Sequence, residues 1–197
     1  MWTDAVAVYP WVGERYLTPR IIKRRTLLLG ESNYTEPDKF NSELVINCVK
    51  DDMSRDQAGA QRDTTGFCRF ATKIRRIIFG CDEKFHPSEF WNDFAFYNFV
   101  QSLVGLHARQ RPTPEMWRES ILAFEEVVFT LNPERILVLG KANWQNLLNN
   151  FPHMLANEYS GELHLTKGSV KVGYVNHPSS SLSYAKWNPI AESLLQK

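Results

Sequence analysis

Two polar segments at opposite ends of the chain contain residue types that can do chemistry. Glu31 follows the apolar segment 27–30, and His177 follows the mostly apolar segment 170–176. An apolar run that breaks abruptly into small and polar residues is typical of a buried strand that ends in a loop. In open α/β sheets, ligands bind at the carboxyl ends of the parallel strands. We therefore expect the carboxylate and the imidazole to face the same crevice.

Each of these two residues has a second interpretation. Gly30 allows the backbone to approach a ligand closely, which favours a site at Glu31, but Glu31 could equally cap the next helix or pair with an arginine. Pro178 stiffens the loop after His177. An imidazole near neutral pH suits proton transfer or the stabilisation of a growing negative charge. A histidine that only makes structural hydrogen bonds is the alternative for His177.

Two further segments contain candidate ligand contacts. Ser179, Ser180 and Ser181 offer hydroxyl and backbone N–H groups that can bind phosphate oxygens where a loop meets a helix N-terminus, or they form an ordinary polar turn. Asn98 interrupts the apolar segment 94–100, and a buried amide must find hydrogen-bond partners. Its amide can offer a donor and an acceptor to the edge of a planar ligand. Alternatively, it can make all of its hydrogen bonds to groups of the protein core.

Composition restricts the class of protein. With 197 residues, 43% hydrophobic and 13% aromatic, the chain is expected to form a single domain over 1–197 with a substantial core. The 23 Lys and Arg residues nearly balance the 22 Asp and Glu residues, so a polyanion must be held by a local patch. The three cysteines lack metal-ligand spacing, and we expect no metal and no disulfide framework. Without a basic and apolar leader or an uncharged run of about 20 residues, the chain is expected to be a cytoplasmic monomer outside the membrane.

The alternation of apolar and amphipathic segments predicts an α/β fold. Residues 1–25 show no clear period and are expected to form an irregular arm. We expect strands at 26–30, 94–100, 135–140 and 170–176, with an edge piece at 162–166. We expect helices at 42–55, 65–79, 114–131, 141–149 and 189–196, with Ser42 capping the first and Gly80 ending the second. Strands that alternate with helices favour a parallel sheet covered on both faces.

The order of these segments resembles that of the uracil-DNA glycosylase superfamily. The resemblance rests on the loop 30–34 (G-E-S-N-Y), on Asn98 in a second strand, on the segment 136–141 and on the loop 177–183, and it covers most of the chain from Thr26 to Leu195. The early loop and the late H-P-S-x-x-S loop are more specific together than either is alone. The resemblance implies a three-layer α/β/α sandwich with a central, mostly parallel four-stranded sheet.

The resemblance also implies an activity, which is hydrolysis of the N-glycosidic bond of uracil or a related deaminated base in DNA during base-excision repair. The target base would be flipped out of the duplex into a tight pocket. Glu31 and His177 would be the catalytic residues. His177 would stabilise the departing uracil anion, and the loop with Glu31 would position the attacking water or steady the sugar cation. No cofactor is implied.

Further roles follow from the same resemblance. Asn98 would read the uracil edge, and Tyr34 stands where some members place an aromatic that excludes the methyl group of thymine. An aromatic residue should stack on the base, with Phe67, Phe40 and Phe70 as candidates. Leu182 lies one residue after the expected minor-groove wedge. Phosphates would meet the serine-rich loop with Arg109, Arg111 and Lys186. The predicted substrate-binding residues are Gly30, Ser32, Tyr34, Phe67, Asn98, Ser179 and Leu182.

The first loop departs from the family pattern at two positions. Ser32 stands where many members have Asp or Asn and cannot act as a base at neutral pH, and Asn33 stands where a proline is common. Two alternatives to the glycosylase are therefore a non-catalytic protein that binds a nucleobase, nucleotide or nucleic acid in the same pocket, and a different enzyme on this scaffold. The expected partner is DNA, either uracil-containing or single-stranded, or a nucleobase ligand.

Overall fold

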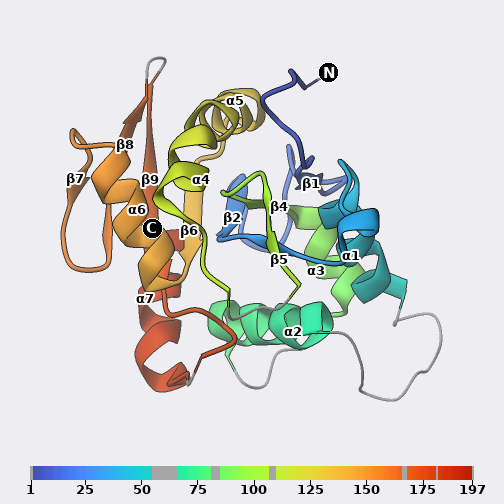
Figure 1. Cartoon of the computed structure of the whole chain (residues 1–197). Helices are drawn as coiled ribbons and strands as arrows, with labels where there is room; N and C mark the ends of the chain where they lie inside the picture. The colour runs from blue at the N-terminus through green and yellow to red at the C-terminus, as the bar shows by residue number, and fades with distance from the viewer. Residues whose placement is uncertain are drawn as a thin grey trace.

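A seven-stranded mixed sheet forms the centre of an α/β fold (Figure 1). The computed structural model describes residues 2–54, 66–80, 85–106, 110–165, 168–180 and 182–196. The strand order is β1-β4-β2-β6-β9-β8-β7. The four inner strands run parallel to one another. They are β4 (Phe94–Asn98), β2 (Thr26–Gly30), β6 (Arg135–Leu139) and β9 (Gly168–Val175). The outer strands run antiparallel to their neighbours, and they are β1 (Trp11–Val12), β8 (Ser160–Leu165) and β7 (Leu155–Ala156).

The expectation of a four-stranded, mostly parallel sheet was therefore wrong in size and in type. The inner strands match the sequence prediction closely because β2 and β6 are buried at every position. The outer strands β1 and β7 have two residues each, which is too short for a periodic signal. The arm 1–25, expected to be irregular, contributes β1 to the sheet edge and buries Val6, Val8 and Tyr16 in the core.

Seven α-helices and one short 3₁₀ helix surround the sheet in the described part of the chain. In Figure 1, α2 lies below the inner strands β2 and β4, and α5 lies above them. Helix α2 packs against α1 and α7, and α6 packs on β6 and β9. The helices are η1 (Pro37–Lys39), α1 (Leu44–Ser54), α2 (Gly66–Phe79), α3 (Pro87–Asp93), α4 (Pro114–Glu119), α5 (Ile121–Leu131), α6 (Lys141–Asn150) and α7 (Tyr184–Gln196).

Several helix boundaries differ from the predicted ones for local reasons. The helix expected at 114–131 is broken at Ser120, whose hydroxyl donates to Met116 O and accepts from the Gln101 N–H. At the start of α1 it is Asn41, rather than Ser42, whose side chain accepts a backbone N–H. Helix α7 begins at Tyr184 and contains Pro189 in its interior. Gly80 ends α2 as predicted, with a φ of 94° that favours glycine.

A small second sheet holds the first polar loop. Strand β3 (Asn33–Tyr34) pairs in parallel with β5 (Leu103–Gly105). The sequence prediction placed no strand in either segment, because two or three residues carry no usable alternation. This pairing connects the loop after β2 to the segment after β4, so both loops keep a fixed position relative to the main sheet.

A buried ion pair anchors the helix that lies next to these loops. The Arg75 guanidinium of α2 contacts the Asp52 carboxylate of α1 at 2.9 Å, and the Trp91 indole N–H of α3 donates to the same carboxylate oxygen at 2.9 Å. Both charged side chains are almost fully buried. Removing one partner of such a pair leaves an uncompensated buried charge, so the contact favours a single position of α2 against α1 and α3.

Candidate functional site

The register of the parallel strands brings the predicted polar residues to one edge of the sheet. Gly30 pairs with Asn98, and Leu139 pairs with Val175. Glu31, Asn98 and the loop with His177 therefore follow the carboxyl ends of β2, β4 and β9. Gly140, directly after β6, also lies here, because a Cβ placed on it would be 3.3 Å from the His177 side chain. The predicted residues thus lie together at the carboxyl ends of four neighbouring strands, and we refer to this cluster around Glu31, Asn98 and His177 as the crevice.

Glu31 is buried and paired with an arginine. Its side chain is 6% exposed, and the Arg111 Nη1 atom lies 3.0 Å and 3.3 Å from the two carboxylate oxygens. The Arg111 side chain is 71% exposed. The pairing that the sequence left open as an alternative is therefore present. The arginine covers the carboxylate from the solvent side.

The hydroxyl groups of Ser32 and Tyr34 extend this contact. The Ser32 hydroxyl lies 3.3 Å from Glu31 Oε1 and 3.1 Å from the Tyr34 hydroxyl oxygen. The Tyr34 hydroxyl donates to the backbone carbonyl of Gln110 at 2.9 Å. Burial raises the pKa of Tyr34 above its ordinary value, so its hydroxyl is protonated at neutral pH. Ser32 contributes a hydroxyl beside the carboxylate, and Glu31 is the residue of this loop that can accept a proton.

Asn98 lies directly over Gly30. A Cβ placed on Gly30 would be 2.0 Å from Asn98 Oδ1 and 3.2 Å from the Phe96 ring. The Nδ2 atom of Asn98 donates to Asn33 Oδ1 at 2.9 Å. Only glycine at position 30 leaves room for this amide, so the glycine that the sequence assigned to ligand approach also makes space for Asn98.

His177 is held as a neutral imidazole with a defined tautomer. The Ser179 N–H donates to its Nδ1 atom at 3.2 Å, so in the neutral ring the proton is on Nε2. Burial lowers the pKa of His177 below 6.5, and nearby Arg111 and Lys73 lower it further, while Glu31 acts in the opposite direction. The Nε2–H group is therefore a hydrogen-bond donor without a positive charge at neutral pH.

The aromatic residue next to the imidazole is Phe70 of α2. Its ring centroid is 5.5 Å from that of His177 and 6.0 Å from that of Phe96. Phe67, the predicted stacking residue, packs against Phe70, Phe96 and Trp91. Of these two candidates, Phe70 is therefore the one next to His177, and Phe67 lies behind it in the aromatic cluster, while Phe40 is partly buried against the core.

The late loop uses most of its described polar groups internally. The N–H groups of Ser179 and Ser180 both donate to His177, to Nδ1 and to the backbone oxygen respectively. The Ser179 N–H therefore orients the imidazole and the Ser180 N–H fixes the backbone at His177, so neither N–H group is open to a phosphate. Leu182 is half-buried and packs against the core. Ser181 and Arg109 lie outside the described residues.

Three site residues were missed or placed differently by the sequence analysis. Asn33 was noted only as a departure from the family pattern, yet it contacts Asn98. Lys73 of α2 lies close enough to His177 to lower its pKa. The ammonium of Lys186, predicted to meet phosphates, lies 4.7 Å from the ring centroid of Trp187 and 5.3 Å from that of Tyr159. Spacing along the chain carries no signal for the contacts of Asn33, of Lys73 and of Lys186 with Tyr159, because these join distant elements, whereas Lys186 and Trp187 are neighbours in α7.

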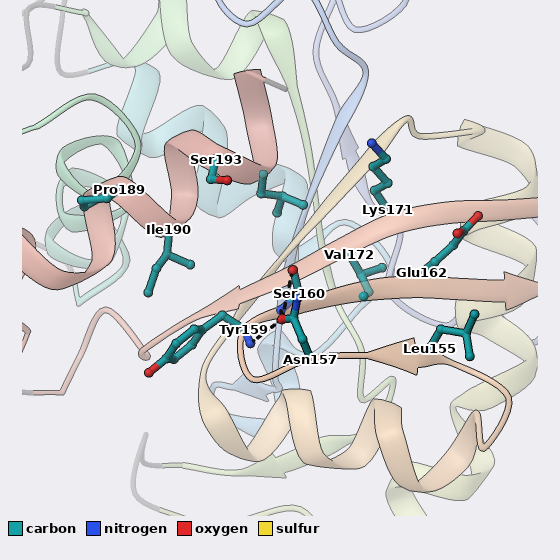
Figure 2. A pocket seen from close by; sticks show the side chains of 12 residues that line it. Leu155, Asn157, Tyr159, Ser160, Glu162, Lys171, Val172, Pro189, Ile190 and Ser193 are labelled. Atoms are coloured by element: carbon teal, nitrogen blue, oxygen red, sulfur yellow. Dashed lines mark hydrogen bonds between the residues drawn. The ribbon is translucent and has the colours of Figure 1, made fainter.

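A cavity of about 650 Å³ lies elsewhere, between α7 and the β7–β8–β9 edge of the sheet (Figure 2). Pro189 and Ile190 of α7 line one side, and Tyr159 and Ser160 line the other. None of the predicted site residues lines it. The cavity and the crevice at the strand ends are therefore separate regions.

In comparisons with known proteins, no family model matches the chain and no curated protein matches it. The described residues include no group of three or more His, Cys, Asp or Glu side chains arranged to hold a metal ion. In the described part of the chain, no helix combines the length and the apolar character that crossing a membrane requires.

Proposed function

We propose that this chain is a glycosylase of the uracil-DNA glycosylase superfamily that hydrolyses the N-glycosidic bond of uracil or a related deaminated base in DNA. The observation that carries the proposal is the meeting of Glu31, Asn98 and His177 at the carboxyl ends of neighbouring strands. The proposal includes a three-layer α/β/α arrangement around the larger mixed sheet, DNA as the partner and a cytoplasmic location. It requires no cofactor.

His177 would act on the leaving group. When the glycosidic bond breaks, its electron pair goes to the base, which becomes an anion. A neutral imidazole with its proton on Nε2 can donate a hydrogen bond to an oxygen of that anion, and the Ser179 N–H holds the ring for this task. Because burial keeps the imidazole neutral, the site has no need to remove a proton from it before the reaction.

Glu31 would act on the sugar side of the bond. The departing base leaves positive charge on C1′, and a buried carboxylate stabilises that charge and accepts a hydrogen bond from the attacking water. Arg111 covers this carboxylate in the free protein. DNA phosphates compete for an exposed guanidinium, so binding of the substrate would draw Arg111 away and leave Glu31 facing the sugar.

One observation favours the binding-protein alternative over catalysis. The ion pair between Glu31 and Arg111 occupies the carboxylate that an enzyme needs. A protein that only binds a nucleobase or nucleic acid could keep this pair intact and use Asn98 and His177 for hydrogen bonds to the ligand. The two functions share the same crevice and differ in whether a bond is broken.

Strand scission after base release separates these functions. Purified protein is incubated with single-stranded and double-stranded oligonucleotides that contain one uracil or one hypoxanthine, and abasic sites are then cleaved with alkali. We expect cleavage at uracil that weakens as salt concentration rises, because phosphate contacts release counterions. Binding of these oligonucleotides without cleavage at either base would contradict the glycosylase and favour the binding protein.

A further inference from the structure

Two asparagine side chains form a directed chain of hydrogen bonds in the crevice. Asn33 Nδ2 donates to the backbone oxygen of Val100 at 2.9 Å, and Asn98 Nδ2 donates to Asn33 Oδ1 at 2.9 Å. A backbone carbonyl can only accept, so Asn33 must turn its nitrogen toward Val100 and its oxygen toward Asn98. Asn98 must then present its nitrogen to Asn33. The Val100 carbonyl thereby sets the orientation of both amides.

The Asn98 side chain keeps an oxygen and an amide hydrogen that could bind a ligand. Its Oδ1 atom lies over Gly30, and among the residues that the structure describes no donor contacts that oxygen. Its backbone oxygen accepts from Gln101 Nε2 at 2.9 Å, which ties the main chain at this position. Asn33 is 3% exposed, so it supports Asn98 from the protein side. Asn98 therefore offers one acceptor and one further amide hydrogen in a fixed order.

We infer that Asn33 is a positioning residue that sets the base specificity of the site by holding the Asn98 amide in one orientation. The choice of a base as the ligand rests on the proposed function, whereas the orientation of the two amides is a property of the free protein. A fixed acceptor beside a fixed donor pairs with a base edge that has a ring N–H next to a carbonyl, as in uracil and hypoxanthine. Cytosine and adenine present a ring acceptor next to an amino group, which needs the opposite order.

Turning the Asn98 amide to suit an amino base is disfavoured by Asn33. The turn would bring Asn98 Oδ1 against Asn33 Oδ1, and two acceptors cannot share a hydrogen bond. Asn33 cannot turn in response without directing its own oxygen at the Val100 carbonyl. A buried polar group that loses its partner is costly, so the amino bases are rejected even though asparagine alone could bind either edge.

Two substitutions at position 33 isolate this role. Asn33→Asp keeps an acceptor for Asn98, whereas Asn33→Leu has a similar size and no acceptor. Both lose the donation to Val100, so the difference between them reports the acceptor for Asn98 together with the charge of the Asp side chain. Thermal unfolding of both variants, with wild type as the reference, identifies the temperature at which all three proteins are folded for the assays.

The first readout is the side-chain amide signal of Asn98 in nitrogen-15 NMR spectra of the free protein, assigned by its absence from Asn98→Asp. We expect its hydrogen exchange with solvent to be about tenfold faster in Asn33→Leu than in wild type, and close to wild type in Asn33→Asp. The second readout is the ratio of the inhibition constants of free cytosine and free uracil during uracil release. We expect Asn33→Leu to reduce this ratio about 10- to 100-fold, mainly through weaker uracil binding, and Asn33→Asp to retain most of it.

The two readouts separate the inference from the proposed function. If wild type releases no base, the proposed function fails, and the exchange rates in the free protein still decide whether Asn33 positions Asn98. Equal exchange rates in wild type and Asn33→Leu would overturn the inference. An unchanged cytosine-to-uracil ratio in Asn33→Leu, in an active enzyme, would also overturn it.

Discussion

The crevice at the strand ends and the cavity beside α7 both contain polar side chains, but these side chains are held in different ways. In the cavity, Asn157 accepts from the Tyr159 and Ser160 N–H groups, so its contacts lie two and three residues away along the chain. In the crevice, Arg111 reaches Glu31 across 80 residues, and Asn98 reaches Asn33 across 65. The Asn157 contacts in the cavity serve a local turn, whereas the polar groups of the crevice are brought together by the fold.

This difference explains why the cavity beside α7 is the weaker candidate for a functional site. Ordering a long polar side chain costs conformational entropy, and in the crevice the fold orders such side chains from distant segments at this cost. Polar groups from several distant segments that meet at the carboxyl ends of parallel strands match the usual position of ligand sites in α/β folds. Matched substitutions in the two regions test whether function is confined to the crevice.

The largest expected effect is at the carboxylate. Glu31→Gln keeps the size of the side chain and removes its charge, so we expect base release to slow about 10²- to 10⁴-fold. Glu162→Gln is the control, because Glu162 lines the cavity of Figure 2 and bonds to the Ser169 hydroxyl. We expect its single-turnover rate to be within about twofold of wild type. Equal losses in both variants would mean that the crevice has no special role.

The second largest effect is expected at the imidazole of His177. His177→Ala removes the Nε2–H donor from the leaving group, and we expect the single-turnover rate to fall about 10²- to 10³-fold. His164→Ala on β8 is the matched control, because His164 is exposed and lies away from the strand ends. Unfolding temperatures of the two variants should be similar to wild type. A His177→Ala enzyme with a wild-type rate would remove this residue from the mechanism.

Glycines in the two regions give a sharper comparison. Gly30→Ala would place a Cβ 2.0 Å from Asn98 Oδ1, and Gly161→Ala would place one 2.4 Å from the backbone oxygen of Leu155. We expect Gly30→Ala to displace the Asn98 amide and lower kcat/KM about 10²-fold. We expect Gly161→Ala to strain the β7–β8 pairing and cost about 1–3 kcal/mol of unfolding free energy with little change in rate. Chemical denaturation and steady-state kinetics on both variants measure the two effects, and a reversed pattern would contradict the assignment of function to the crevice.

The inner strands and the position of the site could be predicted from the sequence, whereas the contacts between the site residues could not. The run Leu27, Leu28 and Leu29 predicted a buried strand because strands covered on both faces consist of consecutive apolar residues, and all three side chains are fully buried. The same reasoning placed Glu31 and His177 at strand ends. The seven-stranded sheet was missed because its edge strands are short or irregular.

The contacts within the site depend on loops that the sequence pattern does not specify. Ser120 breaks the predicted helix 114–131 through its bond to the Gln101 N–H, and Arg111 lies in the segment just before that helix. A buried Asn98 was expected to need partners, yet nothing in the spacing identified Asn33 as one. The identity of a hydrogen-bond partner across 65 residues follows from strand register, which depends on tertiary packing.

The smallest expected effect concerns pH and applies to the crevice alone. Burial places the pKa of His177 below 6.5 in the folded protein, while in the unfolded chain it returns to about 6.5. Between these two values the unfolded chain binds more protons, so the free energy of unfolding falls as the pH is lowered through this window, and above pH 6.5 His177 contributes no slope. His177→Gln, which keeps a side-chain donor, should lose this part of the pH dependence, whereas the exposed His164→Gln should keep it. Because the neutral imidazole is the proposed active form, the part of the pH–rate profile that belongs to His177 should fall only below pH 6.5. A rate that rises as the pH drops through 6.5 would show that the protonated ring is the active form instead.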